Sequence, residues 1–368
     1  MYKAIDKWFL PYLFRKRRPA VTGITDVLFC VCDHFEPFHE ASREEAAIRI
    51  SRWALQFPHL TADFTDADGY PPAHTFFYPV SQPNEETLGG VASLCRNHHA
   101  EMEIHLHHDH DTPANLIMTL EAAKARLVEQ QMLCRDEQGR IRFGFVHGDW
   151  ALDNSHPKGR FCGVSTELEI LKNLGCYADF TMPSAPDHTQ TRTINSIYYA
   201  LDTPAPKSHD RGFPFHVVAS GETNPLRDDP KSLLLVQGPL GFNFEQRKFG
   251  FLPRLENGEI TDLNPPCPER MRLWLRLGIH VVGRPEWVVI KLHTHGAIPR
   301  NMRCLLGESM VNFYHYLQTT FKEQNQLRLH YLTARELVNI LHAAEAGESG
   351  NPGQFRDYRY KPICAKTL

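Results

Sequence analysis

Seven short stretches of the chain are apolar throughout or alternate between apolar and polar residues. Each has the length of a β-strand, and most of the segments between them have the composition of helices. Strands that are separated by crossover helices favour a parallel sheet, so we predict an α/β fold. The predicted strands cover residues 26–33, 73–80, 101–107, 141–148, 176–182, 287–293 and 327–332.

Capping residues mark the start of several intervening helices. Ser42 is followed three residues later by Glu45, which is the capping-box pattern of a helix N-terminus. Thr112 precedes Pro113, a cap followed by proline at the first helical position. Thr333 is the expected cap of the last helix. These signals support the alternation of strands and helices.

Residues 183–285 break this rhythm and hold much of the proline. We interpret them as one further strand with a long insertion on the rim, because no Gly/Ser linker flanks them. The predicted organisation is therefore an N-terminal amphipathic and basic segment over 1–25, one domain over 26–345, and a C-terminal tail over 346–368. We expect the tail from residue 348 to be loosely held.

Composition excludes several classes of protein. Of the 368 residues 23% are charged and 42% are hydrophobic, and the net charge of −3 gives no reason to expect binding to nucleic acid. The nine cysteines are scattered, without the spacing of a zinc ribbon or a disulfide scaffold, so a reducing cytoplasm is the simplest location. Cys30 and Cys32 lie two apart in an apolar run and are expected to be buried thiols on one side of a strand.

The N-terminal residues 1–18 allow two interpretations. Their apolar residues precede a basic cluster, Arg15 to Arg18, which is the reverse of the order in a secretory signal. The stretch is too short and too interrupted, by Pro11 among others, to span a bilayer. It is a candidate for peripheral contact with an anionic membrane, which would place the protein at the inner membrane surface. Alternatively, it is a helix packed on the outside of the domain with a solvated basic end.

Histidine and aspartate follow four of the predicted strands. The carboxyl ends of parallel barrel strands gather at one face, where active sites form. Neutral imidazole and carboxylate are good ligands for zinc and similar ions, so this crowding predicts one divalent metal ion, with zinc as the expected metal. The residues concerned include Asp33, His34, His105, His107, His108, Asp109, His110, Asp111, His147, Asp149, Asn154, His293 and His295.

The strand period of two predicts which of these side chains face the interior. In the strand 101–107, Glu103, His105 and His107 share one face, and the apolar residues between them share the other. We expect the polar row to face inward. The same reasoning places Asp33 inward at the end of the first strand, with His34 beside it.

Asp33, His107 and His293, in that order, resemble the motifs of the polysaccharide deacetylases, the chitin-deacetylase-like carbohydrate esterases. Residues 331–341, YLTARELVNIL, also resemble the last strand and helix of that family. The resemblance covers about residues 26–345 and implies a distorted (β/α) barrel of seven or eight parallel strands. It implies Asp33 as the base and His293 as the acid, with His34, His107 and Asp111 as metal ligands.

The sequence departs from that family at several positions. His34 replaces the second aspartate of the first-strand pair, and Asp111 replaces the second histidine of the ligand pair. Whether His105, His108 or His110 replaces one of the assigned ligands stays open. The arginine-proline motif expected after the fourth strand is absent. The residues expected to contact substrate are His147, Asp149, Trp150, Asn154 and His295.

The expected activity is the metal-dependent removal of an N- or O-acyl group from a carbohydrate or a sugar-containing precursor. A metal-bound water would attack the acyl carbonyl, Asp33 would accept a proton, and His293 would protonate the leaving amine. The stretch 291–296, KLHTHG, also resembles metal-dependent amidohydrolases and histidinol-phosphatase-like phosphoesterases. Two metal ions per chain, together with hydrolysis of phosphate esters, would favour that alternative. A third reading is a catalytically inactive, carbohydrate-binding barrel in polysaccharide assembly.

Overall fold

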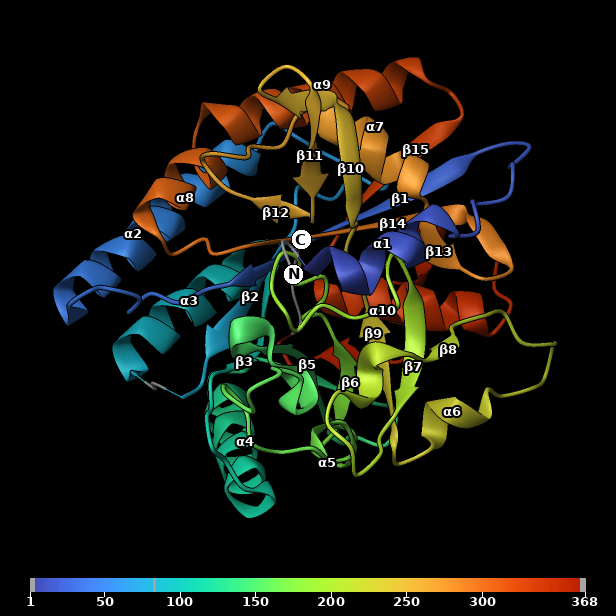
Figure 1. The fold of residues 1–368 in the computed structure, drawn as a ribbon. Coiled ribbons are helices and arrows are strands. Elements are labelled where there is room, and N and C mark those ends of the chain that lie inside the picture. The colour runs from blue at the N-terminus through green and yellow to red at the C-terminus, as the bar shows by residue number, and fades with distance from the viewer. Residues whose placement is uncertain (1–3, 82–83, 365–368) are drawn as a thin grey trace.

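The computed structural model describes residues 4–81 and 84–364, and a large, mostly parallel sheet lies at its centre (Figure 1). All seven predicted strands are present. They are β1 (Thr25–His34), β2 (His74–Pro79), β3 (Ala100–Leu106), β5 (Ile141–His147), β6 (Cys176–Asp179), β14 (Arg284–Thr294) and β15 (Leu327–Leu332). The other strands of the sheet are β4 (Cys134–Arg135), β7 (Ile197–Leu201), β8 (Phe213–Pro214), β9 (Ser232–Val236), β12 (Glu259–Ile260), β13 (Ile279–Val281) and β16 (Lys361–Pro362).

The hydrogen-bonded order is β12-β14-β1-β2-β3-β5-β6-β9-β7-β8, and it is parallel from β12 to β9. Strands β7 and β8 continue it in antiparallel pairing, and β15 pairs with the first half of β1. Within the described residues this path does not return on itself, so the predicted distorted barrel of seven or eight parallel strands is not confirmed. Strands β14 and β6 are far apart in this order, yet Nζ of Lys291 in β14 donates to the carbonyls of Phe180 and Met182, just beyond β6. The sheet is therefore curved, so that these strands approach each other.

Helices cover the outside of the curved sheet, as Figure 1 shows for α2, α3, α4, α8 and α9. Ser42 and Glu45 form the predicted capping box, Thr112 caps a helix that begins with Pro113, and Thr333 caps the last helix. The helices are α1 (Ile5–Leu13), α2 (Arg43–Thr61), α3 (Glu85–Asn97), α4 (Pro113–Glu129), α5 (Glu167–Asn173), α6 (Pro225–Asp228), α7 (Pro268–Leu277), α8 (Pro299–Leu305), α9 (Glu308–Glu323) and α10 (Ala334–Glu345).

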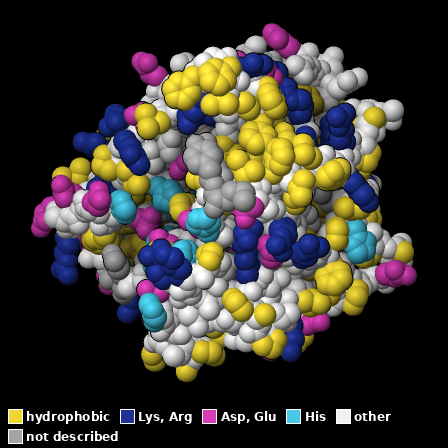
Figure 2. All heavy atoms as spheres, in the orientation of Figure 1, with side chains coloured by type: hydrophobic (Ala, Val, Ile, Leu, Met, Phe, Trp, Pro, Cys, Tyr) yellow, Lys and Arg dark blue, Asp and Glu magenta, His cyan; other side chains and the backbone are white. Residues whose placement is uncertain are grey.

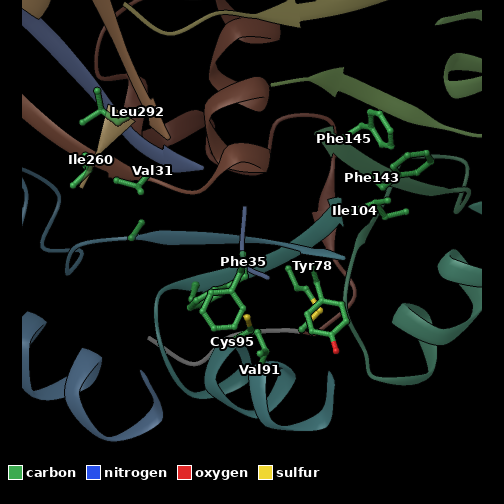
Figure 3. Packing of buried hydrophobic residues seen from close by; sticks show 14 of the residues in the cluster. Val31, Phe35, Tyr78, Val91, Cys95, Ile104, Phe143, Phe145, Ile260 and Leu292 are labelled. Carbon is green, nitrogen blue, oxygen red and sulfur yellow. The ribbon is translucent and has the colours of Figure 1, made fainter. Parts of the chain in front are cut away.

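Alternate residues of β1 belong to two different cores. Val31 packs on the outer side with Ile260 and Leu292, in the cluster drawn in Figure 3. Cys30 and Cys32 belong to the inner cluster, with their sulfur atoms 3.9 Å apart, which confirms the prediction of two buried thiols on one side. All twelve residues of α10 are buried, and the helix fills the interior of the curve (Figure 1).

Residues 183–285 belong to the same domain, because five of their strands, β7, β8, β9, β12 and β13, join the central sheet. Strand β9 lies parallel to β6 and is the further strand that the sequence predicts. Strands β7 and β8 extend the sheet beyond it. A separate hairpin, β10 (Gly241–Lys248) and β11 (Leu252–Glu256), stands on the rim. The apolar run at 215–220 forms only an isolated bridge, between His216 and Val282.

The N-terminal segment forms α1, which packs on the β10–β11 hairpin. Trp8 and Tyr12 are buried, and their rings contact Phe242 at the start of β10. Leu10 and Phe14 remain exposed on the other side of the helix. None of the helices in residues 4–81 and 84–364 combines the length and the apolar character that a bilayer crossing requires.

The expectation of a loosely held tail is wrong for the residues up to 364. Strand β16 pairs with β4, and Tyr360 is buried. Arg356 donates to Asp66 at 2.7 Å and also to the carbonyl of Tyr331. Buried charge-assisted hydrogen bonds of this kind hold the segment against the amino-terminal end of the sheet.

Candidate metal centre

Histidines from three strands converge inside the curve of the sheet, at its carboxyl end. The ring of His34, the last residue of β1, lies 5.2 Å from the ring of His105 in β3 and 5.8 Å from that of His293 in β14. The ring of His295 lies 4.9 Å from His34. His105 and His293 face inward, as the strand period predicts, because their neighbours Ile104, Leu106 and Leu292 pack in the outer core.

Three donor atoms in this region lie close enough together to hold one ion. Nε2 of His105 is 3.0 Å from Nε2 of His107, and Oε1 of Glu36 is 2.9 Å from the latter and 3.9 Å from the former. We call Glu36, His105 and His107 the mouth site. The His107 side chain is 35% exposed, so a substrate or water can reach the site.

Hydrogen bonds on the far side of each ring orient the two imidazoles. Nδ1 of His105 lies 2.9 Å from the carbonyl oxygen of Val146, and Nδ1 of His107 lies 3.0 Å from a carboxylate oxygen of Asp149. When both Nδ1 atoms carry hydrogen, the two Nε2 lone pairs point at each other. Such an arrangement requires a proton or a metal cation between them, and ligating histidines are commonly oriented in this way.

The two imidazoles have opposite electrostatic environments. Burial, together with the charge of His107, lowers the pKa of His105 to about 3. Burial works against the charged form of His107, but the hydrogen bonds that it donates to Asp149 and Glu36 prevail and raise its pKa to about 9. Glu36 is affected in turn: although burial opposes it, contact with His107 lowers its pKa to about 2. The site therefore holds one positive charge against two carboxylates at neutral pH.

Two further buried nitrogen atoms face this region without a partner in the described part of the chain. They are Nε2 of His34 and Nδ1 of His293. Burial and the neighbouring cationic groups hold the pKa of both imidazoles well below the usual range, so both are neutral. Buried polar atoms are normally satisfied, so these two nitrogens indicate a bound ion, water or substrate group.

A cavity of about 230 Å³ lies beside His293 and is lined also by Trp150, Asn257, Glu259 and the segment 183–187. A second cavity, of about 400 Å³, shares Asn257 and Glu259 with the first, and Lys248, Arg254 and Arg300 lie in its wall. Together they form a groove from His293 to the β10–β11 hairpin. Its far end is basic, so it is suited to an anionic group.

Asp33 does not face the mouth site. It is buried on the outer side of β1, where Oδ2 lies 2.9 Å from Nε2 of His74 and Oδ1 accepts from the backbone N–H of Gly296 at 2.6 Å. The prediction that Asp33 faces inward is therefore wrong, and its neighbour His34 faces inward instead. The inner face of β1 carries Cys30, Cys32 and His34, and the alternation of side chains puts Asp33 on the opposite face.

The predicted ligand set of His34, His107 and Asp111 is also not assembled. Asp111 binds elsewhere: Oδ2 lies 2.9 Å from Nδ1 of His108, and Oδ1 accepts from the side chain of Asn115. Asp111 precedes Thr112, the N-cap of α4, and its Oδ1 also accepts from the backbone N–H of Thr112. The side chain is therefore tied to the start of α4. His107 is retained as a candidate ligand, while His34 lies beside the site.

The residues expected to contact substrate are divided between two places. Trp150 lines the cavity, Asp149 holds His107, and His295 lies between His34 and Trp150. His147 and Asn154 lie outside the curve of the sheet. His147 contacts His108 and Glu167, and Asn154 binds Ser165 and the backbone of Gly163.

Sequence reasoning missed Glu36 and Glu167, and it assigned His105 no role of its own. Glu36 could have been found from its position two residues after His34. His105 could have been found because it lies on the face of β3 that was predicted to point inward. Glu167 begins a helix and gave no signal. His110, whose side chain is 80% exposed, pairs with its neighbour Asp109.

No family model matches this chain, and no curated protein matches it. Two imidazoles and a carboxylate, held in orientation and partly exposed, match the three-ligand pattern of a catalytic zinc site with one open position.

Proposed function

We propose that the chain is a metal-dependent hydrolase that removes an N- or O-acyl group from a carbohydrate or a sugar-containing precursor. The observation that carries the proposal is the mouth site, where donor atoms of His105, His107 and Glu36 converge. The ring of His34 lies between this site and His293, which lines the cavity. The resemblance of the strand-end motifs to polysaccharide deacetylases supplies the class of substrate.

One divalent ion, zinc by the chemistry of its ligands, would be held by His105, His107 and Glu36. Bound there, it would supply a water of lowered pKa and polarise the acyl carbonyl. Asp149 fixes the orientation of His107 through Nδ1. The role of Asp33 becomes that of a positioning residue, which contacts His74 on one side and the backbone N–H of Gly296 on the other.

His293 takes over proton transfer in this proposal. It is neutral at rest and lines the cavity, so it begins as a proton acceptor and can then return the proton to the leaving group. His34, also neutral, lies near enough to share this role. Trp150 offers an aromatic face to a sugar ring, and Lys248 and Arg254 suit an anionic substituent farther along the groove.

We also propose that one face of the protein contacts anionic membranes, which would bring a lipid-linked precursor to the groove. Figure 2 shows hydrophobic side chains over the hairpin and beside α1, on the face where histidines are also visible. The exposed apolar residues there are Leu10, Leu13, Phe14, Phe244, Phe249, Phe251 and Leu252. Arg15, Arg17 and Lys248 supply positive charge nearby, as a peripheral membrane surface requires.

A phosphoesterase or amidohydrolase with two metal ions is the alternative, because a second group of donor atoms lies outside the sheet, around His108. That group is closed to solvent, which disfavours a role in two-metal chemistry. An inactive carbohydrate-binding barrel would leave the mouth site without a metal.

The deciding experiment is elemental analysis of protein purified without chelator, followed by assays of acetate release from N-acetylated sugars and of phosphate release from phosphate esters. We expect zinc to be present and acetate to be released. Phosphate release without acetate release would support the phosphoesterase. Absence of both activities, with sugar binding retained, would support the inactive barrel.

A further inference from the structure

A second cluster of ligand-type side chains lies outside the curve of the sheet, between β5, α5 and the loop after β3. Nε2 of His108 is 2.8 Å from Nε2 of His147 and 3.1 Å from Oε1 of Glu167. Sγ of Cys162 is 3.5 Å from Oε2 of the same carboxylate. One donor atom from each of the four side chains lies within 4.8 Å of the others.

The two imidazoles of this cluster are oriented by contacts of their Nδ1 atoms. Nδ1 of His108 lies 2.9 Å from Asp111, and Nδ1 of His147 lies 2.6 Å from the carbonyl oxygen of Gly148. When both Nδ1 atoms donate, the two Nε2 lone pairs meet at 2.8 Å, which is repulsive unless a cation lies between them. This carboxylate–histidine and carbonyl–histidine arrangement is the usual support of ligating imidazoles.

The sulfur atom of Cys162 is also held by hydrogen bonds. The backbone N–H groups of Asn154 and Val164 point at Sγ of Cys162, at 3.3 and 3.4 Å. Donors aimed at a sulfur atom suit a thiolate better than a thiol. Glu167 is fully buried and accepts from the backbone N–H of Asp153 at 2.6 Å.

We propose that His108, His147, Cys162 and Glu167 hold a structural zinc ion, distinct from the ion of the mouth site. Two neutral imidazoles, one thiolate and one carboxylate balance the charge of a divalent cation, and four ligands complete a tetrahedral site. The thiol of Cys162 gives up its proton to solvent when the ion binds. The cluster is buried and leaves no open position, which is the property that separates structural from catalytic zinc sites.

The ion would hold together three segments that border the mouth site. His108 adjoins His107, and His147 is two residues from Asp149, which orients His107. The loop of Cys162 is docked closely, because the backbone N–H of Asp111 donates to the carbonyl of Cys162 at 2.9 Å. A Cβ at Gly163, where φ is +104°, would lie 2.5 Å from that same nitrogen, so the approach requires glycine.

The test uses the full chain and three variants. Wild-type protein purified without chelator is expected to hold two zinc ions, Glu167→Gln one, and His110→Ala, which alters an exposed histidine of the same loop, two. Glu36→Gln, at the mouth site, is expected to lose the other ion and keep the buried one. If wild type and Glu167→Gln hold the same amount of metal, the second site does not exist.

Cobalt substitution gives a readout independent of variant stability. Wild-type protein loaded with Co²⁺ is expected to show a thiolate-to-cobalt charge-transfer band, which Cys162→Ser loses and Glu36→Gln retains. Absence of this band from the wild type would overturn the proposal and would mean that a proton on His108 bridges the cluster. Neither result depends on whether the protein hydrolyses an acylated sugar.

Discussion

Oδ2 of Asp33 lies 2.9 Å from Nε2 of His74, on the side of β1 that faces α2. The other oxygen of Asp33 holds the backbone of Gly296, whose carbonyl in turn accepts from the indole of Trp53. Asp33 therefore joins β1, β2 and the loop after β14 at the point where their inner faces carry His34 and His293. Its contribution is to the architecture of the site.

This arrangement predicts that Asp33→Asn lowers stability and leaves part of the turnover. A buried hydrogen bond to a charged group contributes about 2 kcal/mol, so we expect a loss of that order in the free energy of unfolding. His74→Ala should cost a similar amount, and the double variant less than the sum, because both changes break one contact. Urea unfolding of the three variants measures this. Complete loss of turnover with unchanged stability would instead restore Asp33 as the base.

The mouth site predicts a graded response to changes around His107. His107→Ala should remove the ion and the activity, since it deletes a ligand. Asp149→Asn should keep the ion but weaken its affinity about 10- to 100-fold, because Asp149 acts only through Nδ1 of His107. Zinc titration against a competing chelator measures both. His110→Ala is the control and should behave as wild type; equal zinc affinity in all four proteins would refute the assignment.

Asp179 predicts a dependence of stability on pH. Burial raises its pKa to about 7, despite hydrogen bonds from Thr181. The folded state then binds more protons than the unfolded state between about pH 4 and pH 7, so this carboxyl group makes stability fall as pH rises through that window. The effect is at most about 4 kcal/mol. Urea unfolding of wild type and Asp179→Asn should show their difference changing with pH in this direction, and a constant difference would contradict the prediction.

The exposed face of α1 and the hairpin predicts binding to anionic vesicles. The double variant Phe249→Ser and Phe251→Ser should reduce cosedimentation, because both side chains are exposed and apolar. Met118→Ser, which removes an equally exposed apolar residue from α4, is the matched control. Added salt should weaken the binding, since basic residues contribute to it. Equal cosedimentation of all three proteins would show that the patch does not contact membranes.

Much of the fold follows from local pattern. The alternation of apolar runs and capped helices determined all seven predicted strands, and Ser42, Thr112 and Thr333 begin helices as predicted. Period two also placed His105 on the inner face of β3. These features depend on residues close together in the chain, so sequence spacing alone is sufficient to predict them.

Tertiary structure decided which of the many histidines and carboxylates meet. Side chains alternate between the two faces of β1, so a shift of one residue exchanges which of Asp33 and His34 faces inward. The packing of α2 on the outer face and α10 on the inner face decides which of them does. The pairing of Glu36 with His107, and of Glu167 with His108, joins residues far apart in the chain. Such contacts depend on how strands and loops are brought together in space, and no local spacing encodes them.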